Sequence, residues 1–308
     1  MKYLVTKTIS CVKKFVWSFS LVLIAISSGC GSDDTEESPA VLGPESGIVV
    51  ETLNITGDYL GDDAISIGDD GSLYVSHLAS AAGKTIFKVS PNGSSTAFSG
   101  DLTAPMGHTF NAENALIVAF NGPNFLGSID SGGALSTFLE DSRFQGGSLV
   151  ADSEDNLYHT VFTTNRIYKI SPDKEVELLA SGGPLNVPFG ITLDDDGNVY
   201  AANFSDGRIN KVTSSGELST LADLPASIGY ITFTNGQLYA TGFSNHRIYR
   251  VSLDGSYEVL IGSGEPESND GVGGEVAFAS PNGIAASRDG RFLYVTQKNF
   301  QIRRLTLE

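Results

Sequence analysis

The sequence predicts an all-β fold, a six-bladed β-propeller with four antiparallel strands per blade. Three observations predict it: a phrase that recurs about every forty residues, period-two alternation in the strands of each repeat, and Gly- or Asn-containing turns between them. The phrase is a Gly or Ala with an apolar neighbour, a turn with Asp, Asn or Gly, and a strand anchored at 74, 117, 158, 200, 239 and 294. Repeats of this length with four short strands are typical of propeller blades.

Two further strands follow each anchor. The third strands alternate polar and apolar residues, as half-buried strands do, and are expected at Thr85–Val89, Leu126–Ile129, Arg166–Ile170, Arg208–Val212, Arg247–Val251 and Gln301–Leu305. Turns such as Asn92-Gly93, whose residues tolerate positive φ, lead into the fourth strands. Those are expected at Ser94–Phe98, Ala134–Leu139, Glu175–Leu179, Glu217–Leu221 and Tyr257–Ile261.

The sixth repeat lacks a fourth strand, because the sequence stops at Glu308 after the third. Residues 47–54 have the pattern of a strand and belong to no repeat. We therefore expect the N-terminal strand to close the C-terminal blade, which would remove a free sheet edge.

The N-terminus has the pattern of an export signal. Lys13 and Lys14 precede an apolar run, Phe15–Ile26, that is shorter than the ~20 residues of a spanning helix. With Cys30 directly after Gly29, the segment resembles a bacterial lipoprotein signal, although Ser27 stands where leucine is usual. The resemblance implies cleavage before Cys30 and lipidation of Cys30; an ordinary cleaved signal or an uncleaved anchor are the alternatives.

Three segments are therefore expected: a lipoprotein signal peptide at 1–29, a flexible acidic tether at 30–46, and the propeller at 47–308. The expected location is extracytoplasmic. The lipid on Cys30 would anchor the protein to a membrane, and the outer membrane or the cell surface is expected. The acidic stretch that follows Cys30 resembles surface-export signals of Bacteroidetes lipoproteins, and a plain solvated linker is the alternative.

Charge and thiol content exclude several functions. Without residues 1–29 the chain has 15 basic and 36 acidic residues, a net charge of −21. Nucleic acid is not an expected partner, because binding phosphates requires clustered Lys and Arg. Of the two cysteines, Cys11 leaves with the signal and Cys30 takes the lipid, so the mature body would contain neither a disulfide nor a cysteine nucleophile.

The last repeat carries the most specific motif. It includes Pro281-Asn282-Gly283-Ile284 and, later, Leu293-Tyr294-Val295 and Ile302-Arg303-Arg304, and Pro188-Phe189-Gly190-Ile191 begins a looser copy. These phrases resemble NHL-type repeats and the wider group of gluconolactonase-like (SMP-30-type) propellers. The resemblance spans roughly residues 60–308 and concerns blade architecture more than function, because one fold hosts unrelated activities.

The lactonase resemblance implies a metal site at the mouth of the central channel. The positions that match its ligands precede the Gly or Ala that opens each innermost strand: Asp63, Met106, Gly146, Phe189, Ile228 and Asn282. Only Asp63 and Asn282 offer oxygen ligands suited to a divalent cation such as Ca²⁺, and Asp62 would be a third. The alternative is that Asp63 and Asn282 cap strand starts beside a wet channel.

Further residues are expected near the upper face. His77 lies three residues after an anchor, and His246 lies in the corresponding loop of the fifth repeat. Phe189 and Asn203 are expected at the same end of their blade. The candidate ligand-binding residues are Asp62, His77, Phe189, Asn203 and His246. Phe162, Phe204 and Phe243 each lie four residues after an anchor, where they would either stack on a ligand or pack blade against blade. The run Asp194-Asp195-Asp196-Gly197-Asn198 resembles a Ca²⁺ loop and is equally explained by hairpin turn chemistry.

The leading functional hypothesis is a lipid-anchored binding or scaffold module that uses its loop-rich upper face. Its ligand would be a small molecule, a glycan or a protein. The alternative is a metal-dependent, lactonase-like hydrolase with its site at the channel mouth. No catalytic residue is predicted, and neither a Gly-x-Ser-x-Gly elbow nor a phosphate-binding loop occurs.

Overall fold

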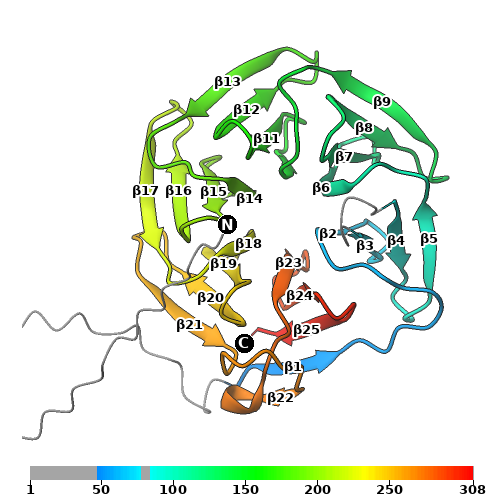
Figure 1. Cartoon of the computed structure of the whole chain (residues 1–308), viewed down its shortest axis with the longest axis vertical. Coiled ribbons are helices and arrows are strands. Elements are labelled where there is room, and N and C mark those ends of the chain that lie inside the picture. The colour runs from blue at the N-terminus through cyan, green and yellow to red at the C-terminus, as the bar shows by residue number, and fades with distance from the viewer. Residues whose placement is uncertain (1–46, 78–83, 308) are drawn as a thin grey trace, which may run out of the picture. The chain divides into compact units, whose positions relative to one another are not determined.

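The computed structural model describes residues 47–77 and 84–307, which form a ring of six β-sheets around a central channel (Figure 1). Five sheets contain four consecutive strands, ordered from the channel outward. The predicted six-bladed propeller is thereby confirmed. The signal, tether and lipidation site at Cys30 lie outside the described residues. Within the described part of the chain, no helix is long and apolar enough to cross a membrane.

The blades follow the repeats of the sequence. Blade 1 contains β2 (Ile65–Ile67), β3 (Leu73–Ser76), β4 (Ile86–Val89) and β5 (Ser95–Ser99). Blade 2 contains β6 (Pro105–Phe110), β7 (Leu116–Phe120), β8 (Phe125–Ile129) and β9 (Leu135–Glu140). Blade 3 contains β10 (Leu149–Ala151), β11 (Leu157–Val161), β12 (Arg166–Ile170) and β13 (Val176–Ser181). Every strand predicted in these three repeats is present, with ends shifted by a few residues.

Blade 4 contains β14 (Pro188–Leu193), β15 (Val199–Asn203), β16 (Arg208–Val212) and β17 (Leu218–Asp223). Blade 5 contains β18 (Ile228–Thr234), β19 (Gln237–Gly242), β20 (Arg247–Val251) and β21 (Tyr257–Ile261). Blade 6 contains β23 (Pro281–Ala286), β24 (Phe292–Gln297) and β25 (Ile302–Thr306). Its outer part comes from β1 (Val49–Thr52) and β22 (Gly271–Val272).

The N-terminal strand closes the ring as the sequence predicted. β1 pairs antiparallel with β25, from Val49 opposite Thr306 to Thr52 opposite Arg303 (Figure 1). The sequence did not predict the fifth strand, β22, which pairs with the free side of β1. β22 lies in the long segment between β21 and β23. β1 is therefore held on both sides, and neither side remains a free edge.

Arg303 holds this closure together from inside. Its side chain is 0% exposed, and its guanidinium donates to the carbonyl oxygens of Ala277 (2.9 Å) and Asn269 (2.7 Å) and to Asp270 Oδ1 (2.8 Å). Asp270 Oδ1 also accepts a hydrogen bond from Thr52 Oγ1 at 2.8 Å. A buried charge persists only when it is paired, and here the pairing joins β25, β1 and the segment that contains β22.

The Asp-rich hairpin turns are structural, as turn chemistry predicts. Asp194 Oδ1 accepts from the backbone N–H groups of Asp196 (3.0 Å) and Asn198 (2.8 Å), and its Oδ2 accepts from the Tyr200 hydroxyl at 2.9 Å. Asp152 makes the corresponding contacts in blade 3. Both carboxylates are thus used by their own hairpin.

Candidate functional site at the channel mouth

The innermost strands all begin at one end of the channel, which we call the mouth and define by Asp63, Met106, Gly146, Phe189, Ile228 and Asn282. Threonines two residues after three of the anchors set the spacing of blades here. Thr160, Thr241 and Thr296 donate to the backbone carbonyls of Phe189 (2.8 Å), Asn282 (2.5 Å) and Asp63 (2.7 Å) in the next blade. Each link fixes a mouth residue relative to the preceding blade.

Asp63 and Asn282 meet at the mouth although 219 positions separate them. Asn282 Nδ2 donates to Asp63 Oδ1 at 2.8 Å, and the Tyr230 hydroxyl lies 3.3 Å from Asp63 Oδ2. Gly229 makes room for Asn282, since a Cβ there would lie 2.5 Å from Asn282 Oδ1. Both oxygens of the Asp63 carboxylate therefore accept donors from blades 5 and 6.

Asp62 forms a charged group with the neighbouring strand ends. Its Oδ2 lies 2.9 Å from Lys298 Nζ, and its Oδ1 lies 3.4 Å from His77 Nδ1. The Asp62 side chain is 3% exposed, whereas those of Lys298 and His77 are 37% and 18% exposed. Lys298 has three donors and uses one on Asp62, so the ammonium can still donate toward solvent or a ligand.

Burial dominates the electrostatics of Asp63. The residue is completely buried, which raises its pKa to about 7. Lys298 opposes that shift, Asp62 adds to it through like charge, and the hydrogen bonds from Asn282 and Tyr230 lower the pKa. The pKa of Tyr230 is raised well above its ordinary value, first by burial and then by Asp63, so the phenol stays protonated and donates.

An aromatic arc lines the other half of the mouth. Phe189 is central: its ring centroid lies 5.9 Å from Phe162, 6.0 Å from Phe204 and 5.2 Å from Tyr230. Phe204 extends the arc to Phe243 at 5.6 Å. All four phenylalanines are partly exposed. The arc spans blades 3 to 5, and Tyr230 connects it directly to Asp63.

Glycine at the blade 3 mouth position is required by this arc. Gly146 has φ 69°, and a Cβ there would lie 2.1 Å from the Phe162 ring. The Phe162 ring thus occupies the space that a side chain would fill in another blade.

The predicted site residues divide into two groups. Asp62, Asp63, His77 and Asn282 come together, and Phe189 joins them through Tyr230. Asn203 is 0% exposed, and its Nδ2 donates to Pro184 O (2.8 Å) and Asp206 Oδ1 (2.9 Å). These contacts hold the loops of blade 4, so the role of Asn203 is structural.

His246 also has a structural partner. Its Nδ1 accepts a hydrogen bond from the backbone N–H of Ser280 at 3.1 Å, and its backbone has φ 61°. It links blade 5 to the segment that leads into β23. His246 is therefore assigned a structural role, and within the described residues no contact of its Nε2 points to a ligand.

Two important mouth residues were missed by the sequence reasoning, Lys298 and Tyr230. Lys298 lies four residues after the anchor at 294, the position that Phe162, Phe204 and Phe243 occupy in their blades. That equivalence was a usable signal. Tyr230 gave none, because it occupies an inner-strand position where apolar residues are ordinary and its contact with Asp63 crosses 167 positions.

The residues at the mouth fit a divalent cation poorly. Both Asp63 oxygens already accept protein donors, and the Lys298 ammonium lies where a cation would neutralise Asp62. Within the described residues, no group of three or more His, Cys, Asp or Glu could hold a metal ion. Asp62 is paired with the Lys298 ammonium and Asp63 with two neutral donors, so the two carboxylates do not form an open set of hard ligands.

No protein-family model and no curated protein matches the sequence. Solved structures with the same fold include a gluconolactonase from Xanthomonas campestris, with a TM-score of 0.63, 14% identity, and coverage of 88% of this chain and 98% of that one. Virginiamycin B lyase from Staphylococcus aureus gives a TM-score of 0.61, 18% identity, and coverage of 85% and 100%.

An auxiliary nutrient binding protein from Bacteroides thetaiotaomicron is also similar, with a TM-score of 0.68, 13% identity, and coverage of 84% of this chain and 76% of that one. At such identities the likeness shows the fold alone. The chain is a six-bladed propeller similar in architecture to gluconolactonase-like and lyase propellers, and to a binding protein on the same scaffold.

Proposed function

We propose that this protein is an extracytoplasmic, lipid-anchored binding module that holds a small amphipathic molecule at the channel mouth. The ligand would place an apolar or ring face on the aromatic arc and direct hydrogen-bond acceptors to Lys298 and His77. The observation that carries the proposal is the continuity of these two halves through Tyr230, which contacts both Phe189 and Asp63.

The chemistry of the two halves supports this type of ligand. Partly exposed aromatic rings offer broad contact area at low entropic cost, and ligand sites combine apolar walls with a few polar groups. Lys298 is the most exposed member of the charged group. Asp63 is completely buried and beyond a ligand's reach, so its role is to hold Asn282 and Tyr230 in place.

An anionic naphthalene dye, 8-anilinonaphthalene-1-sulfonate, tests the proposal because it combines aromatic rings with an acceptor group. We expect the fluorescence of the dye to increase when the folded protein is added. Thermal unfolding of each sample checks that the protein is folded. Phe204→Ala and Lys298→Met should each weaken dye binding several-fold.

Phe138→Ala is the matched control, since Phe138 is also partly buried but lies on β9, at the outer edge of blade 2. Equal loss of dye binding in all three variants, or none in the two mouth variants, would contradict binding at the mouth.

The second candidate is the metal-dependent, lactonase-like hydrolase, favoured because the fold brings together Asp63 and Asn282, the two residues at positions that match lactonase ligands. It is tested by thermal unfolding with Ca²⁺, Mn²⁺ and Zn²⁺ together with a lactone hydrolysis assay. A metal that binds only the native state adds about 2.7 kcal/mol at a concentration of 100 Kd. Because the residues fit a dication poorly, we expect no such shift; a shift that Asp63→Ala or Asn282→Ala abolishes would favour the hydrolase.

A further inference from the structure

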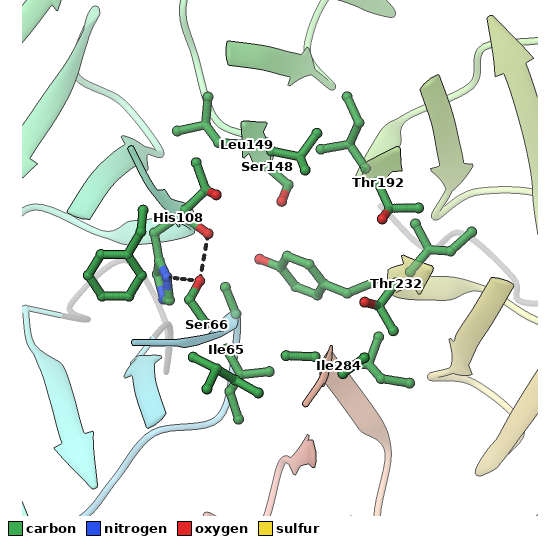
Figure 2. A pocket seen from close by; sticks show the side chains of 18 of the residues that line it. Ile65, Ser66, His108, Ser148, Leu149, Thr192, Thr232 and Ile284 are labelled. Carbon is green, nitrogen blue, oxygen red and sulfur yellow. Dashed lines mark hydrogen bonds between the residues drawn. The ribbon is translucent and has the colours of Figure 1, made fainter. Parts of the chain in front are cut away.

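A hollow lies in the central channel, further along the innermost strands than the mouth residues. It has a volume of about 260 Å³ and is lined by residues from all six innermost strands. Figure 2 shows it in close view, with Ser66, Ser148, Thr192 and Thr232 around its centre. The lining residues come after the mouth residues along each inner strand, which places the hollow below the mouth.

Hydroxyl groups dominate the polar lining. The hydroxyls of Ser148, Thr192 and Thr232 point toward the middle of the hollow (Figure 2), and they come from blades 3, 4 and 5. Ser148 and Thr192 are only 4% and 7% exposed. Among the described residues, no hydrogen bond joins these three hydroxyls to another protein group. These hydroxyls face the hollow, so water or a ligand that fills it supplies their hydrogen-bond partners.

The lining is almost free of charge. His108 is 5% exposed, and burial lowers its pKa to about 4. Ser66 Oγ donates to His108 O at 2.8 Å and lies 2.8 Å from His108 Nδ1, so the neutral ring donates to the hydroxyl. Arg288, the one charged side chain among the described lining residues, is 70% exposed and pairs with Asp69 at the rim.

Tyr230 separates the hollow from the mouth. Its ring lines the hollow while its hydroxyl reaches Asp63 in blade 1, so the side chain runs across the channel from blade 5. The charged group around Asp62 and Asp63 therefore lies on the other side of this ring. A molecule in the hollow would meet hydroxyls and apolar side chains rather than carboxylates.

We propose that this hollow is a second binding site, for a small uncharged polyhydroxy molecule of the size of a polyol or a single sugar ring. Hydroxyls both donate and accept, which matches the hydroxyls of such a ligand. An ionic ligand would lose its hydration without gaining an opposite charge. The volume lies below the ~300–1,000 Å³ typical of drug-sized pockets, which limits the ligand to a small molecule.

Titration calorimetry with myo-inositol and glycerol, compared with their monophosphates, tests the site. We expect the two polyols to bind and the two phosphates not to. The double variant Ser148→Ala, Thr192→Val removes two hydroxyls while nearly conserving shape. Since a net hydrogen bond of ~1 kcal/mol corresponds to about fivefold in affinity, the double variant should bind about 25-fold more weakly.

The matched control is Thr96→Val with Ser136→Ala, two exposed hydroxyls on outer strands, which should bind like wild type. Phe204→Ala should also leave polyol binding unchanged, which separates this site from the proposed mouth site. If the double variant fails to fold, crystals of the wild-type protein soaked in myo-inositol replace it and should show the ligand beside Thr192.

No polyol binding, equal binding of the phosphates, unchanged binding in the folded double variant, or soaked crystals without ligand in the hollow would each overturn the proposal.

Discussion

Asp63 combines complete burial with a like-charged neighbour, and its acidity should therefore govern part of the pH dependence of stability. Its pKa is about 7 in the folded protein against an ordinary value near 3.8. Between these values the folded state holds the proton and the unfolded state releases it. The contribution of Asp63 is therefore fully present below about pH 4 and is lost as the pH rises through 7.

Buried histidines act in the opposite direction. Burial lowers the pKa of His108 and of His159 to about 4, so both are neutral in the folded state where the unfolded chain binds protons. Their contribution rises as the pH increases from about 4 to 6.5. The two histidines outweigh the one aspartate, so among these three groups a net rise of stability with pH remains in this range.

Asp63→Asn removes the titrating group and nearly conserves its volume. We expect its free energy of unfolding, relative to wild type, to increase between pH 4 and pH 7.5, by up to about 4 kcal/mol at 1.36 kcal/mol per pKa unit. The measurement is urea unfolding at several pH values. Altered hydrogen bonds in the variant would shift its free energy of unfolding by the same amount at every pH. If the difference between variant and wild type does not change with pH, the raised pKa of Asp63 is contradicted.

At the scale of single residues, the sequence indicated which side chains reach the mouth but not what they do there. Asp63 and Asn282 could be placed because each precedes a repeated Gly or Ala. Whether Asp63 and Asn282 bind a cation or each other depends on which other side chains contact them. Lys298 and Tyr230 supply that answer, and they come from parts of the chain that no local pattern connects to Asp63.

At the scale of elements, β1 is the strand on which ring closure depends. Val50 is 1% exposed and packs in the core between blades 5 and 6, whereas Val49 next to it is 37% exposed. Beyond β1, Thr56 exchanges backbone hydrogen bonds with the start of β5, through Gly93 O (2.9 Å) and Ser95 N (2.8 Å). The N-terminal segment therefore joins the outer strands of blades 6 and 1.

Val50→Ala should lower the free energy of unfolding by about 2 kcal/mol, from lost methyl burial and the resulting cavity. Val49→Ala is the control one residue away, and its effect should stay within about 0.5 kcal/mol. Deletion of 47–54 should reduce the melting temperature much further. A deletion variant that melts like wild type would show that the ring closes without β1.

Strand prediction worked wherever alternation and turn residues coincide, as in β12, β16 and β20 with their Arg-Ile starts. It failed for β22, which has only two residues, Gly271 and Val272, in a segment without alternation. Such a strand forms because β1 presents free backbone groups, so it depends on the tertiary pairing and leaves no periodic signal.

At the scale of the whole molecule, the proposed location rests on Cys30, which the structure does not describe. Cys30→Ser in the expressing bacterium should abolish incorporation of labelled palmitate and move the protein from the membrane to the soluble fraction. The melting temperature of the propeller should be unchanged. Palmitate labelling that persists in the variant would exclude lipidation at Cys30.

The closing strand also has a mechanical consequence. If the chain is anchored upstream of Gly47, any pull on the anchor reaches β1 before every other strand. β1 is clamped between β25 and β22, so two ladders would resist its extraction together. In a tethered propeller of this kind, a force from flow or from a bound partner would act first on β1, and blade 6 would be the first blade to unfold.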